Sequence, residues 1–144
     1  MITVSGSVQT DLPPERTFAY LSQFEHTSEW DPGTPVVEKR SQGPVAVGHR
    51  YHAEALFRGK RSSIEYEVIE LGTGFIKLRG ENRTVEAFDS IEVKPSGSGS
   101  EVTYTAQFRM KGPVKLLQPL LRPAFNSLRD PALNGMKQRL QSLV

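Results

Sequence analysis

The final segment of the chain, residues 112–144, has the spacing of an amphipathic helix in a sequence that otherwise favours strands. Its apolar residues recur at the 3.6-residue spacing of one helix face; they are Leu121, Phe125, Leu128, Ala132, Met136, Leu140 and Leu143. A helix of about 25 residues would be roughly 37 Å long. Such a helix needs an equally long apolar partner, which the preceding strands can supply as a curved sheet. A sheet that wraps around one helix tends to leave a pocket between the two.

The sequence before this segment consists of short runs in which apolar and polar residues alternate, as they do in half-buried strands. The first run precedes Asp11, and six later runs cover residues 35–40, 48–57, 61–71, 75–79, 85–93 and 101–111. Tight turns such as 58–60 separate them, which favours antiparallel neighbours. Because each run has one apolar and one polar face, the predicted sheet is covered on one side only.

Two short helices are expected between the first two strands. One begins near Asp11 or Pro13, since proline is well tolerated in the first helical turn, and the other covers residues 25–30 and ends before Asp31. The C-terminal segment is expected to be kinked, or divided at its start, because each proline removes a backbone donor. Its prolines are Pro119, Pro123 and Pro131.

Length and composition limit the possible functions. A chain of 144 residues suits a single domain over residues 1–144, and its net charge of +2 is too small to indicate nucleic acid. The absence of cysteine excludes disulfides, thiolate metal sites and a cysteine nucleophile. No stretch approaches the roughly 18 apolar residues of a membrane span, and the N-terminus alternates rather than forming a signal sequence. We therefore expect a cytoplasmic protein, either a monomer or a homodimer.

Four short stretches of this sequence resemble those of a known superfamily. They are E-W-D-P at 29–32, V-G-H-R-Y at 47–51, Y-E-V-I-E at 66–70 and E-V-T-Y-T at 101–105. With the order of the elements, they make the chain similar to the polyketide cyclase/dehydrase-like branch of the START-related (SRPBCC) superfamily. The resemblance covers nearly the whole chain. It implies an α+β helix-grip fold, in which a curved antiparallel sheet of about seven strands wraps around a long C-terminal helix.

The same resemblance implies a cavity between sheet and helix that holds an apolar or aromatic small molecule. No cofactor is expected. The inner faces of the predicted strands mix small alanines with large aromatic residues. Such a mixture either leaves a void or packs to native density against the helix. The residues expected to bind the ligand are Trp30, Tyr51, Ala53, Tyr66, Tyr104, Ala106, Phe108, Phe125, Leu128 and Met136.

Asp89 is the most unusual residue of the pattern, because alternation places it on the same face as Ala87 and Ile91. A carboxylate on an inner face must be paired, neutralised or exposed to a pocket. Asp89 is therefore the one candidate catalytic residue, as a general acid/base or as a ligand anchor. Alternatively, it is a structural partner of an arginine or tyrosine, or a bulge turns it outward.

The other candidates also have structural alternatives. The tyrosines could orient a ligand, but a buried tyrosine usually finds some hydrogen-bond partner, and Trp30 is either a lid residue or packs against the sheet. No metal site is expected, because His49 and His52 are three residues apart on a strand and face opposite sides.

Three functions remain open from the sequence. The first is binding of a hydrophobic or aromatic small molecule, lipid-like or polyketide-like. The second is an aromatic polyketide cyclase/dehydratase-type enzyme that folds a reactive chain and moves a proton through Asp89 or a tyrosine. The third is a regulatory interaction module that contacts a partner through the basic helix face or an open sheet edge. This last function needs exposed apolar surface, and none is visible in the pattern.

Overall fold

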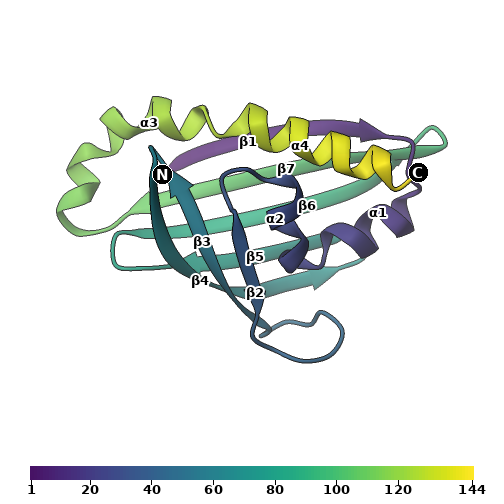
Figure 1. The fold of residues 1–144 in the computed structure, drawn as a ribbon, viewed down its shortest axis with the longest axis horizontal. Coiled ribbons are helices and arrows are strands. Elements are labelled where there is room, and N and C mark those ends of the chain that lie inside the picture. Colours follow the sequence, from purple (N-terminus) through teal and green to yellow (C-terminus); the bar gives the residue numbers. More distant parts are fainter.

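The computed structural model describes residues 1–144 and contains one seven-stranded antiparallel sheet with helices on its concave side (Figure 1). The strands are β1 (Ile2–Thr10), β2 (Val36–Lys39), β3 (Arg50–Phe57), β4 (Lys60–Gly72), β5 (Phe75–Glu81), β6 (Val85–Ser96) and β7 (Gly99–Met110). The helices are α1 (Pro14–Leu21), the 3-10 helix η1 (Phe24–His26), α2 (Thr27–Trp30), the 3-10 helix η2 (Gly112–Leu117), α3 (Gln118–Asn126) and α4 (Arg129–Ser142). The expected α+β fold is confirmed, and none of these helices is long and apolar enough to cross a membrane.

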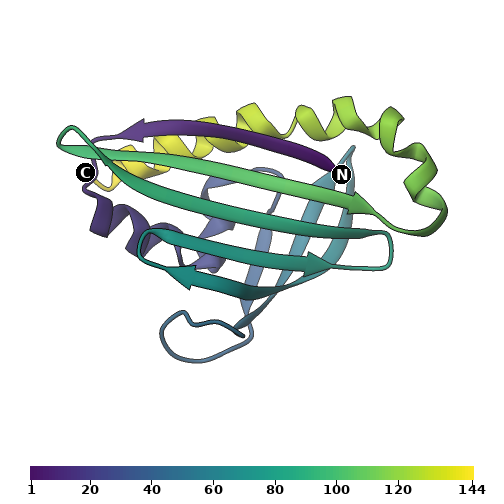
Figure 2. The same cartoon turned by 180° about the vertical axis from the view of Figure 1, so that it is seen from behind.

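The two edges of the sheet come from strands that follow each other in the chain. The strand order is β1-β7-β6-β5-β4-β3-β2, and β1 pairs with β7 from Ile2 opposite Phe108 to Thr10 opposite Ser100. The chain between β1 and β2 therefore crosses from one edge to the other, and α1, η1 and α2 lie along this crossing. Seen from behind, β5, β6 and β7 lie nearest the viewer, and α2, β2 and β3 are seen behind them (Figure 2).

The alternation of the sequence explains which face of each strand is buried. In β4, Ile64, Tyr66 and Val68 are buried on the concave face, whereas Glu65 is exposed on the convex face. The register between β4 and β5 shifts between Val68 and Glu70. A bulge of this kind bends a strand and increases its twist, so it helps the sheet to curve around the helices.

The C-terminal segment is helical over its predicted extent, but prolines divide it. Pro119 lies in the first turn of α3, where its missing N–H is tolerated. The boundary between α3 and α4 falls at Ser127 and Leu128. In a continuous helix the N–H of residue 131 would bond to the carbonyl of Ser127, and Pro131 has no N–H to give. The segment is therefore three short helices in series.

The predicted apolar stripe of the C-terminal segment packs into the sheet. In α4, Ala132, Met136 and Leu140 are 3%, 0% and 0% exposed, and all three belong to the main core. Phe125 of α3 is buried in a smaller cluster with Ile2 and other residues at the start of β1. Burying a large apolar side chain stabilises a fold by about 1.5–3 kcal/mol, so these contacts hold the helices against the sheet.

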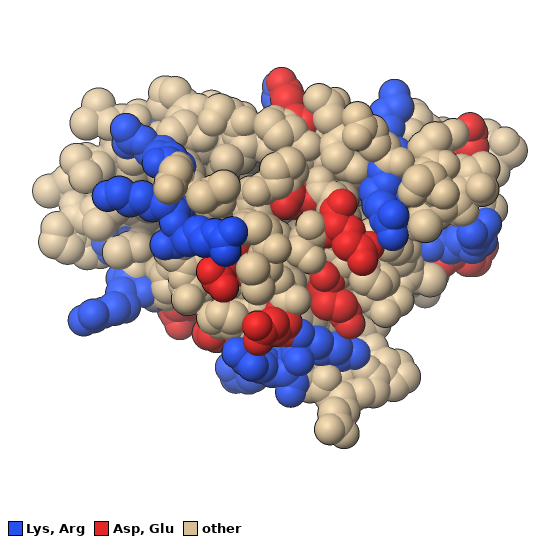
Figure 3. All heavy atoms as spheres, viewed as in Figure 1, with Lys and Arg blue, Asp and Glu red and all other residues tan.

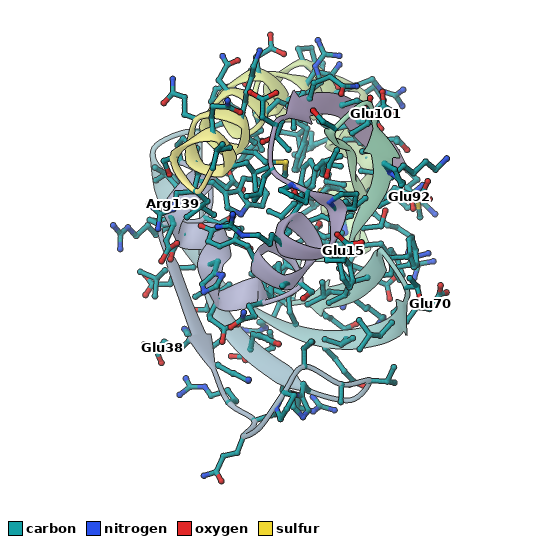
Figure 4. All side chains as sticks on the ribbon, turned by 90° about the vertical axis from the view of Figure 1, so that its right-hand side faces the viewer. Glu15, Glu38, Glu70, Glu92, Glu101 and Arg139 are labelled. Atoms are coloured by element: carbon teal, nitrogen blue, oxygen red, sulfur yellow. The ribbon has the colours of Figure 1, made fainter.

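The far end of α4 is also tied to the short helices. Arg139 Nε donates a hydrogen bond to Tyr20 Oη at 3.2 Å, and that hydroxyl donates to Glu29 at 2.6 Å. Figure 4 looks at this end and shows Arg139 between α4 and the short helices. Close by, Gly135 brings the backbone of α4 against the carbonyl of Trp30, where any Cβ would clash.

Candidate functional site

A cavity of about 530 Å³ lies between the concave face of the sheet and the segment that contains α3 and α4. Most of its wall is apolar, and strands from both halves of the sheet contribute to it. The apolar side chains of the wall include Val4, Ala55, Phe57, Ile64, Ala106, Phe108, Met110, Val114, Leu121, Phe125, Leu128 and Ala132. This volume and composition are typical of pockets for small organic ligands.

Three phenylalanines form one aromatic wall of the cavity. The ring of Phe125 from α3 stacks on Phe57 from β3 at a centroid distance of 4.4 Å and meets Phe108 from β7 at 4.6 Å. Phe125 is the one buried residue of α3, so these ring contacts are the main attachment of the helix to the two strands. They also present a flat apolar surface to anything in the cavity.

Asp89 lies on the cavity wall, as the alternation of β6 predicts. It pairs with Leu78 of β5 and Ala106 of β7 in continuous register, so no bulge turns it outward. Its carboxylate makes neither a hydrogen bond nor an ion pair with another protein group, although it is half-buried and lines the cavity. Burial, and then the charge of Asp31, raises the pKa of Asp89 to about 7. The structural alternatives for Asp89 are therefore not supported.

Asp31 is a second carboxyl group on the same wall. It follows α2, and its two oxygens accept hydrogen bonds from the backbone N–H of Gly33 and the hydroxyl of Thr34, both at 2.9 Å. Burial raises the pKa of Asp31 against the effect of these hydrogen bonds. The sequence predicts only that a short helix ends before Asp31. That its carboxyl group faces the cavity follows from the tertiary structure.

Tyr66 and Tyr104 complete a polar end of the cavity. Burial is the main reason that the pKa of each phenol is well above its usual value, and the nearby Asp89 and Asp31 raise it further. Neither hydroxyl hydrogen-bonds to a protein group, while both residues line the cavity. The cavity therefore has two carboxyl groups and two phenol hydroxyls at one end, and the rest of its wall is largely apolar.

Two positively charged residues on the cavity wall are exposed to solvent. Lys60 from the start of β4 and Arg129 from the start of α4 both line the cavity. Figure 3 shows basic side chains gathered at this end of the molecule, where Figure 1 places α3 and the hairpin of β3 and β4. Acidic side chains elsewhere, such as Glu38, Glu70 and Glu92, project away from the concave side (Figure 4).

Seven of the residues singled out from the sequence come together on the cavity wall. They are Tyr66, Asp89, Tyr104, Ala106, Phe108, Phe125 and Leu128. The other four lie beside the cavity in the packed core: Trp30, Tyr51, Ala53 and Met136. The reason is that the short helices fill this part of the concave face. Phe24 of η1 contacts both Tyr51 and Tyr66 at centroid distances of 5.4 and 4.7 Å, and Trp30 packs edge-on against Tyr104 at 5.6 Å.

Exposed apolar surface is present, although the sequence pattern did not reveal it. Leu116, Leu117 and Leu120 are 83%, 48% and 77% exposed on η2 and α3. The predicted apolar stripe begins at Leu121 and does not include these three leucines, so the pattern gives no signal of their exposure. No cluster of three or more His, Cys, Asp or Glu side chains could hold a metal ion, and His52 pairs with Glu65 at 2.6 Å.

Comparisons with known proteins agree with the fold. A family model described as "Polyketide cyclase / dehydrase and lipid transport" matches residues 1–141. No curated protein matches the sequence. Solved structures with the same fold include a protein from Thermus thermophilus, with a TM-score of 0.80, 16% identity and 98% of each chain covered.

The names of two further solved structures state a superfamily or an activity. One is a START superfamily protein from Mycobacterium smegmatis, with a TM-score of 0.82, 14% identity and 99% of each chain covered. The other is the Zhui aromatase/cyclase from Streptomyces sp. R1128, with a TM-score of 0.78, 13% identity, and coverage of 96% of this chain and 93% of that one. At such identities the likeness concerns the fold alone.

Proposed function

The chain belongs to the polyketide cyclase / dehydrase and lipid transport family, and from that premise we propose that it binds a hydrophobic or aromatic small molecule in the cavity between the sheet and the C-terminal helices. The observation that carries the proposal is the cavity itself. About 530 Å³ of space lined mainly by apolar side chains is an uncommon feature of a packed core. A lipid-like or polyketide-like ligand would place its apolar body against Phe57, Phe108 and Phe125.

The proposal is tested by filling the cavity. Ala106 is 2% exposed and projects from β7 into the cavity beside Asp89. The substitution Ala106→Trp should therefore weaken binding of the neutral fluorescent probe N-phenyl-1-naphthylamine at least tenfold. Overpacking a filled core usually costs about 1–3 kcal/mol, but here the indole would enter existing space. The fold should survive, as measured by circular dichroism and thermal unfolding.

The matched control is Gln107→Trp, which places the same side chain one residue further along β7, on the convex face. This variant should bind the probe as the wild type does. Unchanged probe binding in a folded Ala106→Trp protein, or equal losses in both variants, would contradict the proposal. If the proposal holds, native mass spectrometry of the purified protein, with extraction of any bound molecule, would identify the class of the natural ligand.

A second candidate function is proton transfer to or from the bound ligand, as in a cyclase/dehydratase-type enzyme. Asp89 favours it, because a carboxyl group in the cavity with a pKa of about 7 can act as acid or base near neutral pH. One solved structure of this fold is an aromatase/cyclase by name. Asp89 is the residue that would exchange the proton.

The test is conversion of a linear poly-β-keto thioester, followed by chromatography of the products. The wild type should change the product distribution relative to buffer, and Asp89→Asn should lose most of this effect, since one positioned acid or base contributes about 10²–10⁴-fold. Ala106→Trp, in which the substrate has no room, serves as the control for catalysis in the cavity. A product distribution that is equal in wild type and buffer would leave binding as the function.

A further inference from the structure

The polar end of the cavity contains two carboxyl groups, Asp31 and Asp89, and neither has a positively charged partner in the protein. Asp31 and Asp89 lie on the same wall and are close enough for the charge of Asp31 to raise the pKa of Asp89. The lysines and arginines that form ion pairs do so with other acids, and none pairs with either of these two. An acid held in this way usually has an arginine, a lysine or a metal as its partner.

The groups that face Asp89 are all anionic or neutral. They are Asp31 after α2, Tyr66 of β4 and Tyr104 of β7. The cations of the cavity wall, Lys60 and Arg129, come from the hairpin and the start of α4, and Arg129 bonds instead to Asp130 at 3.1 Å. Asp31 uses one lone pair of each oxygen for Gly33 and Thr34, whereas Asp89 accepts no protein hydrogen bond.

We propose that this end of the cavity, formed by Asp31, Asp89, Tyr66 and Tyr104, is a subsite for a positively charged group of the ligand, such as an amine on an aromatic body. An ammonium group would donate to the Asp89 carboxylate and to a free oxygen lone pair of Asp31. The phenol oxygens can accept further N–H bonds, and the faces of the tyrosine rings attract a cation. The inference rests on the proposed binding function and adds the chemical class of the ligand.

The test compares three ligands of nearly the same size by isothermal titration calorimetry at pH 8. They are the amine 1-naphthylmethylamine, the alcohol 1-naphthylmethanol and the carboxylate 1-naphthaleneacetate. The amine should bind at least tenfold more tightly than the alcohol, since a charge-assisted hydrogen bond to a desolvated carboxylate is stronger than a neutral one. The acetate should bind more weakly than both, because its carboxylate would meet Asp31 and Asp89.

The preference should depend on pH in a defined direction. At pH 5.5 Asp89 is largely protonated in the free protein, given its pKa of about 7. Binding of the ammonium must then release that proton, so the affinity for the amine should fall toward that for the alcohol, by about sevenfold to 30-fold relative to pH 8. The affinity for the alcohol should stay nearly constant. Titrations of the amine near pH 6 in buffers of different ionisation enthalpy should register release of about one proton, which needs no variant.

Asp89→Asn should reduce the affinity for the amine to that for the alcohol and abolish the proton release. An amine that binds no better than the alcohol at pH 8, or equally well to Asp89→Asn, would overturn the cation subsite. If the alcohol still binds in that case, the apolar cavity stands and only the subsite fails. If none of the three ligands binds, the proposed function fails with it.

Discussion

Asp89 is difficult for the folded protein to ionise, because it lies on the inner face of β6 among apolar neighbours and beside Asp31. The unfolded chain ionises an aspartate near pH 4, whereas the folded protein holds the Asp89 proton up to about pH 7. The stability gained from that proton is fully present below about pH 4. It is lost as the pH rises to about 7 and does not change further above that value.

Replacing Asp89 with asparagine should therefore stabilise the protein at high pH. The variant cannot ionise, so its advantage in the free energy of unfolding should be small near pH 4 and rise to at most about 4 kcal/mol above pH 7. Urea denaturation at a series of pH values measures it. Asp130→Asn, at an exposed site in α4, is the control and should show no such rise. A pH-independent difference for Asp89→Asn would mean that Asp89 ionises normally.

Asp89 and Asp31 differ in whether their position on the cavity wall could be predicted from the sequence. Asp89 could be found from sequence, because a carboxyl that interrupts an apolar alternation is a local signal. Asp31 could not, because Asp-Pro-Gly is an ordinary turn sequence and its cavity face depends on where α2 packs. The absence of a basic partner for either acid is likewise a property of the tertiary structure, since the sequence offers 18 lysines and arginines as possible partners.

Helix packing in this fold depends on a close approach between α4 and the end of α2. Gly135 has no side chain to hold the two apart, and its neighbours Ala132 and Met136 are buried. Alanine is a better helix former than glycine by about 1 kcal/mol, so Gly135→Ala would stabilise an isolated α4. The carbonyl of Trp30, a backbone atom that cannot rotate away, is what opposes the change.

We therefore expect Gly135→Ala to destabilise the protein by about 1–3 kcal/mol, in the range of an overpacked core, in spite of its higher helix propensity. The measurement is the midpoint of urea unfolding. Asn134→Ala is the matched control, since residue 134 is exposed on the same turn of α4. This variant should be slightly more stable than the wild type, because alanine is the better helix former. A Gly135→Ala protein more stable than the wild type would mean that α4 lies further from α2.

Elements with a strong local pattern could be predicted, and elements set by packing could not. The seven strands follow from alternation and from turn residues, and Pro131 explains the division of the C-terminal segment. The sequence predicts one short helix over residues 25–30, where the structure has η1 and α2 in succession. It does not predict that Phe24 covers Tyr51 and fills one part of the concave face. That outcome determines which inward-facing residues line the cavity, and it depends on contacts between residues far apart in the chain.

Across the whole molecule, the cavity couples ligand binding to global stability. Its wall contains residues from β1, β3, β4, β6, β7, α3 and α4, so a ligand contacts most of the fold at once. A ligand that binds only the folded state stabilises it by about 2.7 kcal/mol at a free concentration of 100 times its Kd.

Saturating N-phenyl-1-naphthylamine should accordingly raise the melting temperature of the wild type by several degrees, in a single transition, since a change of 1 kcal/mol moves the Tm of a domain of this size by about 2–4 °C. Far-ultraviolet circular dichroism in a short-path cell, with the probe present in the reference, follows the transition. The Ala106→Trp protein should show no shift at the same probe concentration. An equal shift in both proteins would indicate that the probe binds the surface.

The position of β1 at one edge of the sheet, paired with β7 from Ile2 opposite Phe108, has a consequence for the order of events during folding. Of the seven strands β1 is synthesised first and must wait for β7, the last of them, and loops of this length make native pairing slow, on the scale of milliseconds to seconds. The hairpins from β3 to β7 join neighbours in the chain and can form earlier. In the interval, the concave face has neither its edge strand nor α4, so the nascent chain exposes apolar surface that the finished protein reserves for its ligand.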